Sequence, residues 1–294
     1  MNVSRVIFFI LAFLLIKMSY AQDEKPAKSN DELAKELANP NATLVTLAFQ
    51  FDFVSYTGSA PDASNQFSTI LNFQPSLPIP IGKGVNLFVR PNIPIILSQP
   101  VFGDAGFEQK GINLGNISAD VAFGKTWPSK TITIVGAFAG FPTATDQELR
   151  SSEITLGPEV MVAQLFKWGA IGLMVNHAWG VSGIPNEDGS EQEASITSNK
   201  RRHASVTAGQ YFYVVNLKNA WQITGQPTWS YNHEAESGSR LTFPVATGVN
   251  KVVSLGKLPV KISVQYWYYV AQNEAFGPQH QIRLQIAPVV ALPW

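Results

Sequence analysis

Cysteine is absent from this 294-residue sequence, and charged residues make up only 14% of it. A chain without cysteine has no disulfide framework. The four histidines are scattered without the spacing of metal ligands, so the sequence predicts no metal site and no cofactor. Apolar residues reach 45%, but after the N-terminus they never form a run of the roughly 20 residues that a spanning helix needs. These features exclude a disulfide-rich scaffold and a bundle of membrane helices.

The N-terminus has the pattern of a secretory signal. Arg5 precedes an unbroken apolar run from Val6 to Ile16, and small residues follow up to Ala21. We predict a cleaved signal peptide over 1–21; a retained membrane anchor is the alternative, although the run is short for one. The formal net charge is +0, and loss of Arg5 and Lys17 leaves 19 basic and 21 acidic residues, or −2. This balance argues against a nucleic-acid partner.

Residues 22–41 differ in composition from the rest of the chain. Ser29 and Glu32 have the spacing of a helix capping box, Leu33 and Leu37 lie on one helical face, and Pro40 stops the run. The segment is predicted to carry a short amphipathic helix on the periplasmic side. Such a helix either enters the lumen as a plug or lies outside it, and both alternatives stay open.

From residue 42 to the C-terminus, apolar and polar residues alternate with a period of two. This pattern predicts an all-β fold, a transmembrane antiparallel β-barrel over 42–294 with apolar side chains outward and polar ones inward. The predicted strands number about twelve, with ten to fourteen as the range, and we place them at 42–57, 66–78, 85–97, 111–124, 131–142, 152–165, 169–182, 204–216, 220–234, 240–250, 259–270 and 279–292. Prolines within strands remove ladder hydrogen bonds, so bulges are expected at Pro75, Pro91, Pro158, Pro227, Pro244 and Pro288.

Loop lengths and charges support one orientation of this barrel. Every second connection is short and lysine-rich without acids, which is expected on the periplasmic side, whereas the others, such as 98–110, 143–151 and 183–203, are longer and acidic. The last strand ends on Trp294, and aromatic residues gather near both sets of strand ends, as at a membrane interface. We therefore predict a protein of the Gram-negative outer membrane, in contact with its lipids and lipopolysaccharide, whose C-terminal strand is read by the barrel-assembly machinery.

Polar and charged residues on the inward parity are the candidates for lining the lumen. They either form a hydrated pore or hydrogen-bond one another in a packed, closed interior. The candidates in the predicted strands are Asp52, Asn72, Gln74, Asn86, Arg90, Asn92, Asp120, Glu159, Gln222, Gln265, Arg283 and Gln285. Asp52 and Arg283 lie on the first and last strands at similar depth, so closure of the barrel is predicted to join them in a structural ion pair.

The sequence offers little support for catalysis. Ser230 and His233 are three residues apart on one predicted strand, so their side chains face opposite sides and form no catalytic pair. His177 and His233 fall on the outward parity near the headgroups, and we interpret them as interface residues. We predict no catalytic residues and no enzyme. The basic cluster Lys200, Arg201 and Arg202 either contacts lipopolysaccharide phosphates or is a solvated loop flank.

Several segments carry a resemblance to a known family. The sequence resembles an uncharacterised family of Gram-negative outer-membrane proteins known as "transporter" and, misleadingly, as neuromedin U, and it is similar to the outer-membrane barrels of meta-pathway phenol degradation. The resemblance covers nearly the whole mature chain and rests on LAKELANPNA, FQPSLPIPI, NLFVRPNIPII, PTATD, LGPEV, QYFY, SYNHEA, QYWYYV, AFGP and PVVALPW. It implies a membrane barrel with a transport role, and it implies no catalytic residue.

The leading functional hypothesis is therefore a porin-like outer-membrane channel or transporter. Its solute is small and, by analogy with the related family, hydrophobic or aromatic. The alternative is a closed structural or surface-interaction barrel that uses its acidic loops as the contact face. A lipid-modifying outer-membrane enzyme is the third hypothesis.

Overall fold

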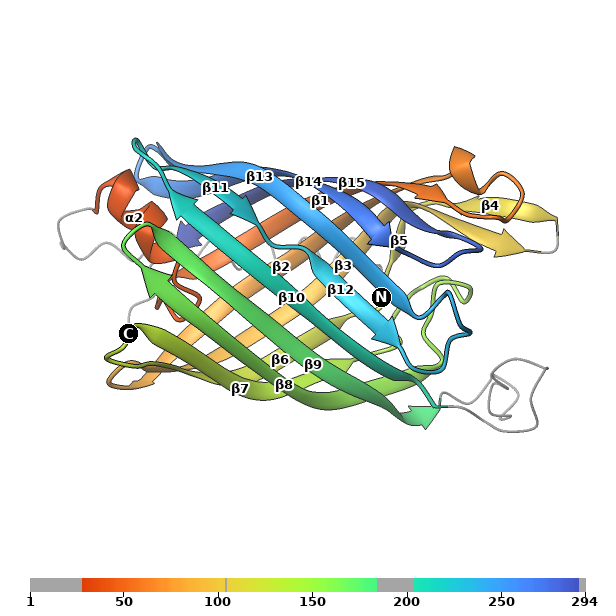
Figure 1. Ribbon diagram of the computed structural model, residues 1–294, viewed down its shortest axis with the longest axis horizontal. Coiled ribbons are helices and arrows are strands. Elements are labelled where there is room, and N and C mark those ends of the chain that lie inside the picture. The colour runs from red at the N-terminus through yellow and green to blue at the C-terminus, as the bar shows by residue number, and fades with distance from the viewer. Residues whose placement is uncertain (1–27, 104, 184–202, 291–294) are drawn as a thin grey trace.

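The computed structural model describes residues 28–103, 105–183 and 203–290. They form a closed antiparallel barrel of twelve strands with one short α-helix at the N-terminal end (Figure 1), which confirms the predicted fold class and strand number. No helix in the described ranges is long and apolar enough to cross a membrane. The predicted signal peptide over 1–21, the basic cluster at 200–202 and Trp294 lie outside these ranges.

Two of the twelve strands are interrupted, so fifteen β segments are distinguished. β4, β5 and β6 follow one another along β3, and β11 and β12 lie end to end between β10 and β13. The helical elements are α2 (Asn30–Leu37) and the 3-10 turn η1 (Ala63–Asn65). The strands are β1 (Val45–Thr57), β2 (Phe67–Gly82), β3 (Val85–Gly103), β4 (Gly106–Lys110), β5 (Asn113–Leu114), β6 (Ser118–Thr126), β7 (Thr131–Gly140), β8 (Glu153–Phe166), β9 (Gly169–Gly183), β10 (Ser205–Asn216), β11 (Trp221–Gly225), β12 (Thr228–Asn232), β13 (Leu241–Leu255), β14 (Leu258–Ala271) and β15 (Gly277–Val290).

The barrel closes where the first strand pairs with the last. β1 runs antiparallel to β15 from Val45 opposite Val290 to Thr57 opposite Gly277, and on its other side it pairs with β2. A bulge between Ser55 and Tyr56 shifts the register near the outer end. Closure leaves no free sheet edge, which a strand in hydrocarbon could not tolerate because its backbone groups would have no partner.

Side chains alternate between the two faces of the wall as the period-two pattern requires. Asp52 is 5% exposed whereas Phe53, the next residue, is 42% exposed. Large apolar side chains cover the outside, among them Val121, Phe123, Val135, Val160, Val162, Ile171, Leu173, Val249, Ile262, Val264, Ile282, Leu284 and Ile286. A contiguous apolar surface of this kind matches the hydrocarbon layer of a bilayer.

The expected bulges at prolines are mostly wrong. A register shift occurs at Pro244, and Pro227 separates β11 from β12. At the other sites the strand loses some pairs with one neighbour but keeps its register. Around Pro75 and Pro91, for example, the pairing of β2 with β3 stops after Phe73–Ile93 and resumes in the same register at Leu77–Val89. The physical reason is that proline removes one donor without adding a residue, so the ladder loses a hydrogen bond but the strands stay aligned.

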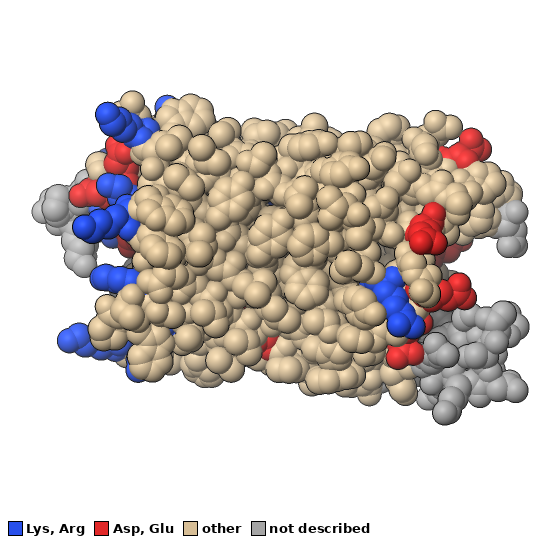
Figure 2. All heavy atoms as spheres, in the orientation of Figure 1, with Lys and Arg blue, Asp and Glu red and all other residues tan. Residues whose placement is uncertain are grey.

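The two ends of the barrel differ in charge. In Figure 2 most of the visible cationic side chains gather at the end that carries α2 and the short turns in Figure 1, and acidic side chains predominate at the opposite end. The short turns contain Lys83, Lys130, Lys167, Lys218 and Lys257. This distribution agrees with the predicted orientation, in which the α2 end is the inner one. We use "inner" and "outer" in this sense below.

One glycine is required for two strands to approach closely. A Cβ on Gly157 of β8 would overlap the carbonyl oxygen of His177 on β9, at a place where the β8–β9 pairing skips two residues next to Pro158. Gly111, in the connection between β4 and β5, has no atom near its Cβ position.

We predict that Gly157→Ala destabilises the folded barrel by about 1–3 kcal/mol, because the added methyl group forces the two backbones apart. Gly111→Ala is the control and should leave stability unchanged. The free energy of unfolding is measured by urea titration of the refolded protein in detergent micelles. Equal stability of the two variants would contradict the predicted close approach.

Candidate functional site

The predicted lumen residues lie on the inner face of the wall. Most have little exposed surface: Asp52, Asn86, Asp120, Glu159, Gln222, Gln265, Arg283 and Gln285 are buried, whereas Asn72, Gln74, Arg90 and Asn92 are half-buried. The structure places most of them in three groups of interacting side chains. Asn86 and Gln222 instead bind the N-terminal segment, and Asn92 has no side-chain hydrogen bond to any described residue.

The first group lies at the closure of the barrel. Asp52 on β1 and Arg283 on β15 are directly opposite each other. The Arg283 guanidinium donates from Nε to Asp52 Oδ1 at 2.6 Å and from Nη2 to Oδ2 at 2.8 Å. The amides of Gln281 and Asn72 donate to the same carboxylate, each at 2.9 Å. Four donated hydrogen bonds therefore satisfy both oxygens of this buried carboxylate.

Aromatic side chains enclose the same ion pair. The Arg283 guanidinium lies over the ring of Trp267, 4.4 Å from its centroid, and Trp267 is almost wholly buried. The hydroxyl of Tyr269 donates to Gln281 Oε1 at 2.7 Å. Both aromatic residues are on β14, the strand next to β15. The closure is thus reinforced by three adjacent strands, β14, β15 and β1.

The second group is a triad of one cation and two carboxylates that begins on β3, two strands from β1. Arg90 on β3 donates from Nε to Asp120 Oδ2 at 2.6 Å and from Nη2 to Glu159 Oε1 at 2.9 Å. Asp120 is on β6, the neighbouring strand, whereas Glu159 is on β8, two strands further round. The arginine therefore ties together an arc of four strands. The second oxygen of Glu159 is buried and has no hydrogen-bond partner.

The third group consists of amides. The backbone N–H of Gln226 donates to Gln265 Oε1 at 3.1 Å, and its side chain donates to Gln285 Oε1 at 3.3 Å. Gln50 and Gln74 form a separate pair at 3.2 Å. These amides line the part of the wall formed by β11–β12, β14, β15, β1 and β2. This part of the lumen is polar and carries hydrogen-bonding groups.

On the opposite part of the inner wall, an apolar cluster lies next to the Arg90 triad. β7 lies six strands away from β14 in either direction round the barrel, so the two strands face each other across the lumen. Around β7, buried apolar side chains point inward from β3, β6, β7 and β8, and they pack with partly buried residues of β8, β9 and β10. The cluster contains Phe88, Ala122, Ile132, Ile134, Met161, Ala163, Leu165, Met174 and Phe212. The lumen is therefore amphipathic, with a polar and an apolar side.

The N-terminal segment 28–44 crosses the inner mouth. At one side, Leu33 and Ala34 of α2 pack against Ala220 and Val252, and Gln222 donates to the carbonyl of Ala34 at 2.8 Å. At the other side, Asn41 holds the β2–β3 turn and β6: its side chain donates to Thr126 Oγ1 at 2.7 Å, and Asn86 donates to its carbonyl at 2.9 Å. β13 and β6 are six strands apart, so the segment spans the mouth.

The start of α2 has the predicted capping box. Ser29 accepts at its hydroxyl from the Glu32 backbone N–H, and the Glu32 carboxylate accepts from the Ser29 backbone N–H at 2.9 Å. Hydrogen bonds from the Ser29 backbone and then its hydroxyl lower the pKa of Glu32. Asp31 accepts from the backbone N–H of Ala220 at 2.9 Å, so the first turn also ties the helix to the β10–β11 turn. The plug alternative for this helix, left open by the sequence, agrees with these contacts.

The outer rim contains a surface ion-pair cluster. Lys110 at the end of β4 bridges Glu108 and Glu148, with Nζ–O distances of 3.1 Å and 3.0 Å. The hydrogen bonds that Lys110 donates to Glu148 and then to Glu108 raise its pKa. Both glutamates are largely exposed, so the cluster contributes little stability.

His177 and His233 are linked on the outward face near the outer rim. The hydroxyl of Thr207 on β10 lies 2.7 Å from His177 Nδ1 and 2.8 Å from His233 Nε2, and Ser205 Oγ is 3.5 Å from His177 Nε2. The rings of Trp179 and Tyr231 contact the two imidazoles. The sequence had not indicated this polar cluster, because its members come from three strands whose register only the structure supplies.

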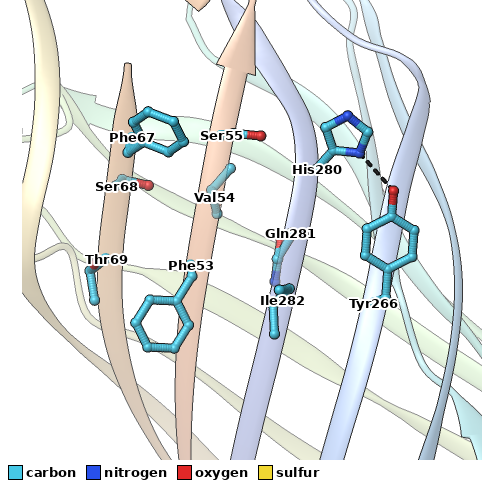
Figure 3. A pocket seen from close by; sticks show the side chains of 10 residues that line it. All are labelled: Phe53, Val54, Ser55, Phe67, Ser68, Thr69, Tyr266, His280, Gln281 and Ile282. Atoms are coloured by element: carbon cyan, nitrogen blue, oxygen red, sulfur yellow. Dashed lines mark hydrogen bonds between the residues drawn. The ribbon is translucent and has the colours of Figure 1, made fainter. Parts of the chain in front are cut away.

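A groove of about 290 Å³ lies on the outward face at the closure seam, near the outer end of β1 and β15 (Figure 3). Its lining comes from β1, β2, β14 and β15: Phe53, Val54, Ser55, Phe67, Ser68, Thr69, Tyr266, His280, Gln281 and Ile282. The hydroxyl of Tyr266 lies 2.7 Å from His280 Nδ1. Because Phe53, Phe67 and Tyr266 are exposed on the outside of the barrel, this groove faces the surroundings and is separate from the lumen.

Comparison with protein-family models and with curated proteins finds no match to this sequence. Comparison with solved structures finds similarity to outer-membrane channels. The COG4313 outer membrane channel from Pseudomonas putida F1 aligns with a TM-score of 0.59 at 12% identity, over 84% of this chain and 94% of that chain. The NanC porin gives 0.49 at 10% identity (83% and 100% covered), and the CymD monoaromatic hydrocarbon channel gives 0.48 at 9% (91% and 95%). At such low identity the likeness establishes the barrel fold alone.

We predict that Asp52→Asn destabilises the barrel by about 3–5 kcal/mol, because it leaves the Arg283 charge buried without a counter-ion. The double variant Asp52→Leu with Arg283→Met should recover most of this loss. Urea titration in micelles measures both values. Glu148→Gln, which removes one partner of the exposed Lys110 cluster, is the control and should cost no more than about 1 kcal/mol. A loss for Asp52→Asn as small as that of the control would contradict the predicted role of the ion pair.

Proposed function

We propose that this protein is an outer-membrane channel that passes a small solute with an apolar or aromatic body through the barrel lumen. The observation that carries the proposal is the segment 28–44, which crosses the inner mouth from the β11–β13 side to the β3–β6 side. A barrel that served only as a membrane scaffold would need no segment across its mouth. We call segment 28–44 the stopper. In this account the segment closes the lumen at rest and moves aside for passage.

The stopper is held weakly enough to be released without unfolding the barrel. α2 has only eight residues, and only Leu33 and Ala34 within it are fully buried. Burial of one leucine side chain contributes roughly 1.5–3 kcal/mol. An isolated helix of this length is unstable in water. Undocking would therefore also unfold the helix into a flexible chain segment. The twelve-strand wall does not depend on these contacts, because its backbone hydrogen bonds close on themselves.

The proposed solute class follows from the two sides of the lumen. The apolar cluster around Phe88 and Ile132 offers contact to a hydrocarbon or aromatic body, while the amides of the polar side accept or donate hydrogen bonds. The description of the Pseudomonas putida structure as an outer membrane channel and the resemblance to phenol-degradation barrels agree with this proposal.

Export and membrane insertion form part of the same proposal. We propose that residues 1–21 are removed as a signal peptide, that 22–41 stay periplasmic and that 42–294 insert into the outer membrane. In this scheme the barrel-assembly machinery reads the C-terminal strand ending at Trp294, and Lys200, Arg201 and Arg202 contact lipopolysaccharide. The alternative function, a closed structural or surface-interaction barrel, is favoured by the dense burial of lumen side chains such as Trp267 and Gln222.

We predict that Leu33→Asp raises single-channel conductance in a planar bilayer, because a carboxylate cannot remain in the apolar contact with Ala220 and Val252. Lys35→Asp introduces the same side chain at an exposed position of α2 and should leave conductance at the level of the unmodified chain. Deletion of residues 28–41 should match or exceed Leu33→Asp.

Folding of each variant is verified by heat-modifiable mobility in gel electrophoresis. If folded barrels of the Leu33→Asp variant and of the deletion variant both stay without discrete current steps, the lumen is closed by its own side chains. That result would reject the channel and favour the structural barrel.

A further inference from the structure

Four polar side-chain atoms on the inner faces of β13 and β14 are buried without a hydrogen-bond partner. They are both terminal atoms of Asn250, the hydroxyl of Ser263 and Nε2 of Gln265. The large majority of buried side-chain polar atoms in proteins have a hydrogen-bond partner. Such a concentration of unpaired atoms in one place is therefore a reason to look for a missing ligand.

Lys261 adds a cation to the same place. It lies on the inward parity of β14, two residues from Ser263, and it is partly buried. The other lumen cations each hold a carboxylate, at 2.6 Å for Arg90 and for Arg283. Lys261 forms no ion pair or hydrogen bond with any residue in the described part of the chain. Among the described residues, it is a lumen cation without a counter-ion.

The strand register brings these groups together. Asn250 is directly opposite Ser263, Val252 is opposite Lys261, and Gly248 is opposite Gln265. All four polar residues therefore occupy one patch that extends over two neighbouring strands. Gly248 has no side chain that could cover the patch. Any larger residue would crowd Gln265, because a Cβ at position 248 would lie only 2.8 Å from Cγ of Gln265.

The patch lies directly behind the stopper. Val252, the neighbour of Lys261, is the residue on which Leu33 and Ala34 of α2 pack. Ser254, next along the same face, donates to Asn30 Oδ1 at 2.8 Å. Across the lumen is the apolar cluster around Ile132 and Ile134 on β7. A solute held here would contact donors on one side and hydrocarbon on the other.

We infer that Lys261, Asn250, Ser263 and Gln265 form a binding site for the carboxylate of a small solute with an apolar body. One ammonium group balances one negative charge, and three neutral donors from Asn250, Ser263 and Gln265 complete the hydrogen bonds of two carboxylate oxygens. A dianion such as phosphate would leave a second charge without a cation. This inference rests on the proposed channel function and narrows its solute to aromatic or aliphatic monocarboxylates.

The test compares benzoate with its neutral amide, benzamide, which has nearly the same shape. Binding of each to the refolded mature chain in detergent is measured by calorimetric titration. We expect benzoate to bind at least about tenfold more tightly, since a charge-assisted hydrogen bond contributes enough for a tenfold to hundredfold change in Kd. Equal affinity for the two compounds, or binding of neither, would overturn the site.

Variants of the patch residues test whether this patch causes the preference for benzoate over benzamide. Lys261→Met should remove the preference for benzoate over benzamide, and Lys261→Arg should restore it because the charge is kept. Asn250→Leu should weaken benzoate binding without reversing the preference. Lys251→Met is the matched control: it removes a lysine from the adjacent ladder position, but Lys251 faces outward over the Trp221 ring. Retained preference in Lys261→Met would reject the assignment.

The same preparations separate this inference from the proposed function. Conductance is recorded for the Leu33→Asp variant of each protein. A barrel that conducts but shows no preference for benzoate remains a channel without the carboxylate site. A barrel that prefers benzoate in a Lys261-dependent way but never conducts has the site and is not a channel.

Discussion

The pairing of β1 with β15 closes the barrel and fixes the position of every other strand. Backbone groups of a strand in hydrocarbon must all find partners, and only a closed sheet supplies them. The same pairing fixes the register that places Asp52 opposite Arg283. Since every other strand is aligned relative to its neighbour, closure at this seam sets which residues of all twelve strands share a level of the lumen. The polar patch on β13 and β14, the triad at Arg90 and the apolar cluster follow from that alignment.

The N-terminal segment in the inner mouth is held less firmly than the strands of the barrel wall. The Asp52–Arg283 ion pair and the Arg90 triad each tie strands of the wall together with several short hydrogen bonds. The N-terminal segment, in contrast, touches the wall at a few points on two opposite sides of the inner mouth. A rigid tube with a lightly held stopper can open without loss of the barrel, because the free energy of undocking is much smaller than that of unfolding. The proposed carboxylate site lies where the two parts meet.

Much of this fold could be predicted from the sequence, because the side chains along each strand alternate between the membrane and the lumen, and each short turn carries lysine. Alternation also placed Lys261, Ser263 and Gln265 on one polar face of a strand. It could not indicate that Asn250 lies opposite Ser263, since register between strands depends on turn geometry, here that of the turn between Leu255 and Leu258. The capping box was readable at Ser29 and Glu32, but the docking partners of the helix, Ala220 and Val252, are about two hundred residues away. The expected bulges at prolines were wrong where proline removed a donor without shifting the ladder.

The N-terminal segment shields the lumen from the inner side. The sequence contains no cysteine, so single thiols can be introduced and followed without background. The most direct measurement is the rate at which a membrane-impermeant thiol reagent modifies Ser263→Cys in liposomes, with and without Leu33→Asp, and with the outward Val264→Cys as reference. We expect slow modification of Ser263→Cys while α2 is docked, fast modification once it is released, and slow modification of Val264→Cys throughout. Equally fast modification of Ser263→Cys with α2 docked would contradict it.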